Sequence, residues 1–184
     1  MTVVHPSRLW FVPLGLALSL LLGQQQSSAQ LVSEYQVKAA YMYSFAKFAE
    51  WPAEAFTNAA DPIRLCVLND QPFHSQLTQI VKDKTIAGRA VLAVLIPNGQ
   101  KVRGCHMLFI DSSQAGEAVP LFEALQGSSV LTVGENKSFV DRGGIIGFVM
   151  QGGQVHFQVN HKAATQSGIR LSSRLLSVAK RVIE

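Results

Sequence analysis

The sequence is poor in charge and lacks a basic run. Aspartate, glutamate, lysine and arginine make up 15% of the 184 residues, and the formal net charge is +4 at pH 7. The basic residues are scattered, whereas proteins that bind nucleic acid or anionic lipid through charge carry them in clusters. We therefore expect no nucleic-acid partner. Hydrophobic residues make up 48% of the chain, which argues against intrinsic disorder.

Catalytic signatures are also missing. The sequence contains no G-x-S-x-G, H-E-x-x-H, Walker A or G-x-G-x-x-G motif. The glycine-rich segment 143–147 precedes a predicted strand, whereas a phosphate-binding loop is followed by a helix N-terminus. We expect these glycines to form a tight turn with close backbone packing. Acidic residues are scattered and form no evident pair, so we expect the chain not to be an enzyme.

The histidines predict neither a metal site nor a cofactor. Four of them follow the N-terminal segment: His74, His106, His156 and His161. Cys105 and His106 are sequence neighbours, so on a strand their side chains would point to opposite faces. They would then neither share a zinc ion nor act as nucleophile and base. An approach of His156 to His161 at the end of one predicted strand is the remaining metal alternative.

Only the N-terminus carries a long apolar run. Arg8 precedes an apolar region from Trp10 to Leu22, and the small residues Ser27, Ser28 and Ala29 follow. This order is typical of a secretory signal peptide. An uncleaved anchor helix is the alternative, but the run is shorter than the roughly 20 residues that cross a bilayer. We predict a cleaved signal over residues 1–29 and an exported chain over residues 30–184.

The chain has only two cysteines, Cys66 and Cys105. In an oxidising compartment an isolated pair usually forms a disulfide. Two buried free thiols remain an alternative, because a bridge requires the two Cα atoms to be close. A redox-active pair that exchanges thiols is a further alternative.

Apolar patterns divide the remaining chain into helices and strands. A helix with one apolar stripe is expected over residues 32–50. Trp51-Pro52 should end it, because the residue before a proline avoids the helical conformation. A second helix follows Asp70, which is placed to cap it. Strands are expected over 63–68, 90–96, 107–110 and 130–133, and a further helix over 115–126. Continuous apolar strands separated by helices indicate a parallel sheet covered on both faces.

The last third of the chain has a different pattern. Strands are expected over 144–150 and 155–160, with Gly152-Gly153 as the turn of a hairpin. A final helix is expected over 172–183, with Leu171, Leu175, Val178 and Val182 on its buried side. The sequence thus predicts a single α/β domain with a mixed, mostly parallel sheet. Helices would cover both faces, and an antiparallel hairpin plus a helix would form the C-terminal part.

Three segments are candidates for a partner-binding surface. Aromatic residues are dense on the first helix, and aromatics are enriched where proteins bind one another. The second candidate is a polar turn, and the third is the polar face of the hairpin. The candidate residues are Tyr41, Phe45, Phe48 and Trp51 on the helix, Asp141 and Arg142 in the turn, and His156, Gln158 and Asn160 on the hairpin.

Several segments in one order resemble the YfiR family of periplasmic proteins. The resemblance begins with Tyr35–Tyr41, continues through Trp51-Pro52 and covers essentially the whole exported chain. Its further segments are 65–68, 88–89, 105–110, 131–133, Phe139 with 143–146, 157–160, Ala163, and 171–176 with Ala179. Cys66 and Cys105 match cysteine positions of the family, which supports their pairing. The second cysteine pair of some members is missing, since Val140 and Gly147 stand in that region.

The resemblance implies a regulatory protein. Members of the family are often dimeric and repress an inner-membrane diguanylate cyclase by binding its periplasmic domain. An OmpA-like outer-membrane lipoprotein can sequester the repressor, which raises cyclic di-GMP and promotes biofilm formation. A small-molecule sensor is the alternative function, because α/β sheets bind ligands at the carboxyl ends of their strands. The positions just after Leu68, Ile96, Ile110 and Val133 would form that edge.

Overall fold

The computed structural model describes residues 1–2, 25–97, 102–114, 116 and 118–184, and the side chains of 25–33 lie outside this description. The chain divides into two units, Met1–Ser33 and Glu34–Glu184. The apolar part of the predicted signal, from Trp10 to Leu22, lies outside the described residues. Within the residues that are described, no helix has both the length and the apolar character needed to span a membrane.

The first helix, α1 (Gln25–Phe48), is the predicted one with different bounds. It begins before the predicted Val32 and ends two residues early. Ala49–Glu50 form strand β1 instead, which pairs antiparallel with β9 (Arg170–Leu171). Ser172 N donates to the Phe48 carbonyl at 2.9 Å, so residues from the far end of the chain bind the end of the helix.

The main sheet has eight strands in the order β10-β8-β7-β6-β5-β2-β4-β3. The five central strands β4, β2, β5, β6 and β7 run parallel. The first of them in the chain, β2, lies between the second and the third, which is the doubly wound order 2-1-3-4-5. The strands are β2 (Ile63–Leu68), β3 (Thr85–Ile86), β4 (Arg89–Ile96), β5 (Met107–Ile110), β6 (Leu131–Gly134), β7 (Ile146–Gln151), β8 (Gln154–Asn160) and β10 (Val182–Ile183).

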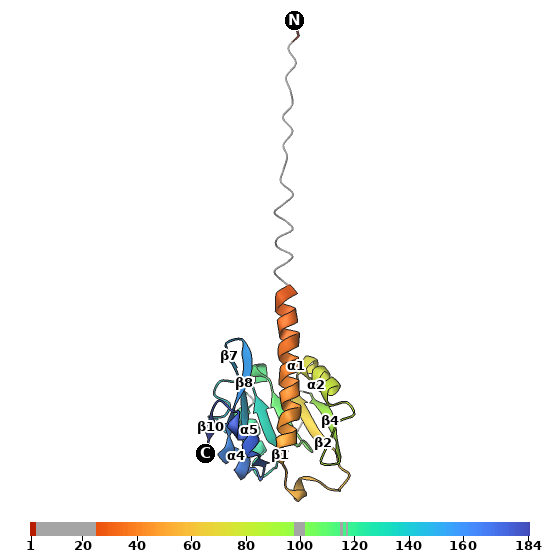
Figure 1. The fold of residues 1–184 in the computed structure, drawn as a ribbon, viewed down its shortest axis with the longest axis vertical. Coiled ribbons are helices and arrows are strands. Elements are labelled where there is room, and N and C mark those ends of the chain that lie inside the picture. Colours follow the sequence, from red (N-terminus) through yellow and green to blue (C-terminus); the bar gives the residue numbers. More distant parts are fainter. Residues whose placement is uncertain (3–24, 98–101, 115, 117) are drawn as a thin grey trace. The chain divides into compact units, whose positions relative to one another are not determined.

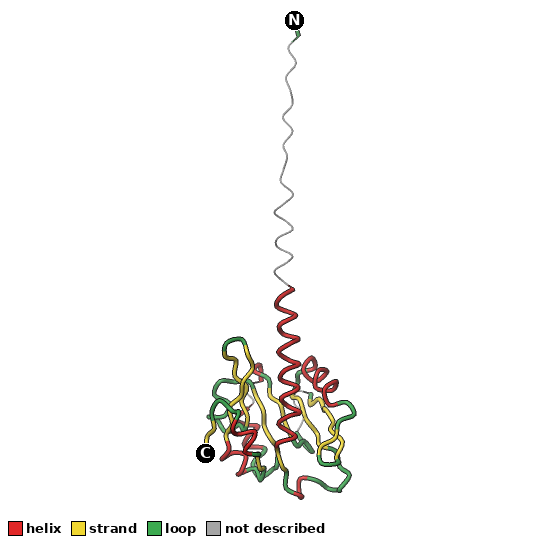
Figure 2. The backbone as a smooth tube through the Cα atoms, in the orientation of Figure 1, coloured by secondary structure: helices red, strands yellow, loops and turns green. Residues whose placement is uncertain are grey.

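The predicted hairpin is confirmed. Strands β7 and β8 pair antiparallel, with Gln151 opposite Gln154 across a two-residue turn (Figure 2). Gly152 and Gly153 have φ of +59° and +74°, the left-handed conformation that such a turn requires at both positions. Val155, Phe157 and Val159 on β8 are buried, as the alternation predicts.

Helices cover both faces of the sheet, as predicted. Asp70 caps α2 as expected, because its side chain accepts a hydrogen bond from Phe73 N at 3.0 Å. The predicted helix over 115–126 is shorter than expected, and the helix α4 was not predicted. The remaining helices are α2 (Gln71–Val81), α3 (Ala118–Ala124), α4 (His161–Gln166) and α5 (Ser173–Ser177), with 3-10 turns at Ala53–Ala55 and Ser112–Gln114.

One face of the sheet carries a large aromatic core. Helices α1 and α2 lie on this side (Figure 1), and α4 and α5 also contribute buried residues to the core. Phe45 has no exposed surface and packs edge-on against Phe157 at 4.9 Å between ring centroids. Phe73 stacks on Phe109 at 4.1 Å. Ring packing therefore joins both helices to the central and C-terminal strands.

The opposite face carries a smaller core beneath α3. Its centre includes Cys66, Cys105 and Phe139, with Phe122 of α3 against the Phe139 ring at 5.2 Å. A Cβ at Gly144 would lie 2.2 Å from the Phe139 ring, and the same holds for Gly134. The expectation of close packing at the glycine-rich segment is thus correct, because only glycine leaves room for this ring.

The predicted final helix over 172–183 is wrong in its second half. Helix α5 ends at Ser177, and Val178 is 65% exposed rather than buried. Val182 belongs to β10, which pairs parallel with β8. Lys180 N donates to the Phe157 carbonyl at 2.9 Å. Residues 182–183 therefore pair with the edge of β8 instead of continuing the helix. This segment is rich in β-branched residues, which favour strands.

Candidate functional site

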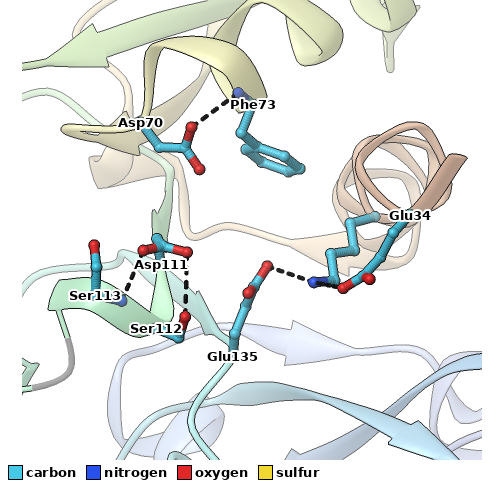
Figure 3. A network of polar contacts seen from close by, with 8 residues as sticks. Glu34, Asp70, Phe73, Asp111, Ser112, Ser113 and Glu135 are labelled. Carbon is cyan, nitrogen blue, oxygen red and sulfur yellow. Dashed lines mark hydrogen bonds and ion pairs between the residues drawn. The ribbon is translucent and has the colours of Figure 1, made fainter. Parts of the chain in front are cut away.

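Three acidic residues follow three neighbouring parallel strands. Asp70 comes after β2, Asp111 directly follows β5, and Glu135 directly follows β6. Because the carboxyl ends of parallel strands meet at one edge of the sheet, the three carboxyl groups lie near one another, each with its own polar contacts (Figure 3). The edge between β2 and β5 is the topological switch point, where sheets of this order bind ligands. This carboxyl edge is the candidate functional site.

Helix α1 supplies a cation at this edge. Lys38 is only 4% exposed, and its Nζ lies 2.8 Å from Glu135 Oε1 and also contacts Glu34. Burial alone would lower the pKa of Lys38, but its bonds to Glu135 and Glu34 outweigh burial and raise the pKa above its ordinary value. The helix is therefore held against the strand ends by a buried charged contact.

The three carboxyl groups differ in their surroundings. Asp70 is 9% exposed, and its Oδ2 has no hydrogen-bond partner among the described residues. Burial raises the pKa of Asp70, and burial likewise raises the pKa of Glu135 despite the contact with Lys38. For Asp111, hydrogen bonds from Ser113 and Ser112 outweigh burial and lower the pKa. The edge therefore holds two carboxyl groups whose pKa is raised and one whose pKa is lowered.

A cleft opens beside these carboxyl groups. It has a volume of about 450 Å³ and is lined by charged side chains, by Gln158 and by the apolar residues Phe148, Val149 and Met150. Lys38, Lys137, Glu34 and Glu135 supply two charges of each sign. This size falls within the range of small-molecule sites, roughly 300–1,000 Å³. Across the described ranges, no three histidine, cysteine or acidic side chains are arranged to hold a metal ion.

The sequence pattern did not reveal this cluster. The acidic residues are scattered along the sequence, whereas the sheet order brings Asp70, Asp111 and Glu135 to one edge. The signal that would have found them is positional, since each lies within two residues after a buried strand. The positions after Leu68, Ile110 and Val133 belong to the predicted ligand-binding edge, and an acidic residue follows each of them within two residues.

The aromatic candidates on α1 face the core instead of one open surface. Tyr41 is half-buried against Phe148 and Phe157, and Phe45 is fully buried. Phe48 and Trp51 are half-buried against the same core. Trp51 Nε1 donates to the His106 carbonyl at 2.9 Å, which fixes the indole in place. Phe45 therefore offers no atom to a partner in this structure.

The polar candidates of the turn and the hairpin end meet at the opposite, amino edge. Arg142 and Asn160 line a cleft of about 370 Å³, together with Lys162 and Phe122. Asp141 is paired with Arg181, with Arg181 Nη2 at 2.6 Å from Asp141 Oδ1. Asn160 has a structural role, because its side chain caps α4 through Ala163 N and donates to the Val140 carbonyl. Arg142 remains exposed.

The remaining hairpin candidates lie apart from that cleft. His156 and Gln158 are half-exposed on the polar side of β8. Gln158 lines the cleft at the carboxyl edge, so the three polar hairpin residues do not share one site. The structure thus divides the sequence candidates between the core, the amino edge and the carboxyl edge.

The two cysteines form a disulfide in the core of the α3 face. Cys66 and Cys105 have Cα atoms 5.8 Å apart and are 1% and 7% exposed. The side chain of the neighbouring His106 makes its contacts away from the disulfide. Its Nδ1 accepts from Arg64 N at 3.1 Å, and its Nε2 lies 3.1 Å from the Ala55 carbonyl. The pairing of the two cysteines is confirmed, and His106 has no contact suited to catalysis with Cys105.

The fold and the edge site define a doubly wound α/β domain with an N-terminal helix tethered across its strand ends. A family model described as YfiR/HmsC-like matches residues 35–180. The chain therefore belongs to this family, as the sequence resemblance indicates. A search of curated proteins found no match.

Proposed function

We propose that this protein is a periplasmic regulator that binds the periplasmic domain of an inner-membrane diguanylate cyclase and keeps that enzyme inactive. The observation that carries the proposal is the match to the YfiR/HmsC-like family over residues 35–180, nearly the whole of the folded domain. Export through the signal at residues 1–29 delivers the chain to the compartment where the partner domain lies. The protein performs no catalysis in this role.

Repression works by a shift of populations. The protein binds the inactive arrangement of the cyclase more tightly than the active one and so increases its share. An OmpA-like outer-membrane lipoprotein that binds the same protein lowers the free pool and releases the cyclase. Cyclic di-GMP and biofilm formation then rise. In the absence of a partner, the protein is a homodimer.

The amino-edge cleft is the surface we assign to the cyclase. Arg142 and Lys162 are exposed cations at its rim, and Phe122 supplies apolar surface within it. This combination fits an acidic segment with an apolar anchor, because arginine and aromatic side chains contribute most at protein interfaces. The aromatic face of α1 is less suited, since its rings are already packed.

Capture of the exported protein from its native envelope, followed by mass spectrometry, tests the proposal. We expect a membrane diguanylate cyclase among the captured proteins, and Arg142→Glu should lose it. Lys82→Glu is the matched control, because Lys82 is also exposed but lies beyond α2, away from the cleft. Recovery of neither a cyclase nor an OmpA-like lipoprotein by the folded wild-type protein would overturn the proposal.

The carboxyl-edge cleft favours a second function, that of a small-molecule sensor. Its position after the carboxyl ends of β5 and β6, its volume and its buried Lys38 paired with Glu135 are features of a ligand site. A panel of periplasmic metabolites, screened by the shift in melting temperature, tests it. A shift seen in the wild type and lost in Glu135→Gln, but kept in Glu123→Gln, would support the sensor. The absence of any shift would leave the regulator proposal standing alone.

A further inference from the structure

One oxygen of Asp70 is buried and has no partner among the described residues. Asp70 precedes α2, where its Oδ1 accepts the capping hydrogen bond from Phe73 N at 3.0 Å. Its Oδ2 accepts no hydrogen bond, although the residue is only 9% exposed. A buried carboxylate without a compensating partner is strongly unfavourable. Capping of α2 therefore accounts for one oxygen of Asp70 and leaves the other without a role.

The free oxygen of Asp70 is directed toward Asp111. In Figure 3, Asp70 Oδ2 lies on the side of its carboxyl group that faces Asp111, and Glu135 lies farther away. The sheet register supports this placement, since Leu68 pairs with Ile110 and the two aspartates follow these strand ends. Burial raises the pKa of Asp70, and the charge of Asp111 raises it further. The two carboxyl groups therefore repel each other across a space that a cation would suit.

Asp111 can bind a cation in addition to its present contacts. Its Oδ1 accepts from Ser113 N at 2.7 Å, and its Oδ2 accepts from Ser112 Oγ at 3.4 Å. Burial would raise the pKa of Asp111, but these hydrogen bonds outweigh burial and lower the pKa. An ionised carboxylate has about four lone pairs on its two oxygens, so both oxygens keep binding capacity. Asp111 is only partly buried, which leaves a route from solvent.

Lys38 does not neutralise this pair of aspartates. Its ammonium group contacts Glu34 and Glu135, and it forms no ion pair with Asp70 or Asp111. Among the ion pairs of the described residues, none involves either aspartate. The pair of aspartates therefore lacks a positive partner from the part of the chain that the structure describes.

We propose that Asp70 and Asp111 bind a hydrated Mg²⁺ ion at the ends of β2 and β5, the switch point of the sheet. Mg²⁺ is commonly held by one or two carboxylates and keeps several waters. Ca²⁺ takes about six to eight oxygen ligands, and the described residues hold no group of three acidic side chains arranged around one ion. The charge of Mg²⁺ matches two carboxylates, and the ion holds the start of α2 against the end of β5.

The melting temperature of the exported protein in MgCl₂ tests the proposal. At about a hundred times its dissociation constant, measured by titration calorimetry, Mg²⁺ should raise the melting temperature by roughly 5–10 °C. NaCl of equal ionic strength should not. Asp70→Asn should abolish the shift, because asparagine still caps α2 but carries no charge. Asp83→Asn is the matched control and should keep the shift, since Asp83 is exposed beyond α2.

Removal of divalent ions separates this role from a packing role. In the presence of a chelator, Asp70→Asn should melt no lower than wild type, because it replaces a buried carboxylate that then has no partner. In MgCl₂ the wild type should melt higher than the variant. A difference between the two proteins that is the same with and without Mg²⁺ would overturn the proposal.

Mn²⁺ locates the ion, because it binds the same kind of oxygen ligands and is paramagnetic. It should broaden the amide NMR signals of residues 70–71 and 111–113 before that of Asn160 at the amino edge. Broadening that begins elsewhere overturns the site, and a larger shift with CaCl₂ than with MgCl₂ overturns the choice of ion. The inference rests on neither the regulator nor the sensor proposal, because these measurements use no partner protein and no metabolite.

Discussion

The two faces of the sheet are stabilised by different means. The α1–α2 face is held by packed rings, among them Phe45, Phe73 and Phe109, which are fully buried. The α3 face has a shorter covering helix and is held by the Cys66–Cys105 bridge and by Phe139 seated over two glycines. The α1–α2 face is stabilised by the large apolar area that it buries. The α3 face has a thinner apolar layer and depends on the covalent link and on close packing. Four experiments test how each face is stabilised.

Truncation of a core ring should have the largest effect. Phe45→Ala should lower the free energy of unfolding by about 3–5 kcal/mol, because it leaves a cavity between Tyr41, Phe148 and Phe157. Urea denaturation measures it. Val37→Ala on the same helix is the control and should change stability by no more than about 0.5 kcal/mol, since Val37 is 39% exposed. Equal losses in the two variants would contradict the core assignment.

Removal of the disulfide should have a similar or slightly smaller effect. The two cysteines are 39 residues apart in sequence, so the double variant Cys66→Ala, Cys105→Ala should lose roughly 3–4 kcal/mol by the chain-entropy model. Urea denaturation with and without reductant measures it, and the variant should be insensitive to reductant. If the protein represses a cyclase, signalling should rise in cells that carry the variant. A variant as stable as wild type would show that packing alone holds the α3 face.

A methyl group added beneath Phe139 should cost less. Gly144→Ala should destabilise by about 1–3 kcal/mol, because its Cβ would lie 2.2 Å from the ring. In a Phe139→Ala background the same substitution should cost much less, and a double-mutant cycle measures the coupling. Gly116→Ala is the control, because a Cβ there meets nothing within 4 Å. Additive costs in the cycle would rule out the proposed fit.

The smallest effect should come from pH. Burial lowers the pKa of His106, whose ring is held neutral between Arg64 N and the Ala55 carbonyl. The pKa of His106 in the folded protein lies below the unfolded value of about 6.5. The stability that the neutral ring contributes is therefore fully present above about pH 6.5 and is lost as pH falls below that value. Wild type should lose more stability than His106→Gln between neutral and mildly acidic pH. Urea denaturation at several pH values measures it, and parallel profiles would contradict the prediction.

Much of the fold follows from local sequence. Strands β2 and β5 have the predicted bounds, because each is a short apolar run buried on both faces of a parallel sheet. The hairpin follows from Gly152-Gly153 and from the alternation in β8. The last helix fails because apolar residues at 171, 175, 178 and 182 fit a helical stripe while β8 offers an edge to the same segment. The local sequence pattern carries no information about pairing with β8, so it predicts a helix there.

The site depended on information that the sequence does not carry locally. Asp70, Asp111 and Glu135 are far apart in the chain, and only the strand order makes them neighbours. Lys38 comes from a helix whose placement over the strand ends is a tertiary result. The aromatic pattern of α1 was misleading for the same reason, since Phe45 packs against β7 and β8 strands that occur more than a hundred residues later.

The pairing of β1 with β9 has a consequence for how the chain matures. Glu50 and Arg170, which contact each other across this pair, are 120 residues apart. Synthesis proceeds from the N-terminus, so β9 is made long after α1. The C-terminal end of α1 can be fixed by the β1–β9 pairing only when residues 170–171 have been synthesised. Until then the apolar side that holds Met42 and Phe45 lacks its final cover. Premature termination just before residue 170 would therefore yield a species that cellular proteases recognise, even though most of the sheet is already present.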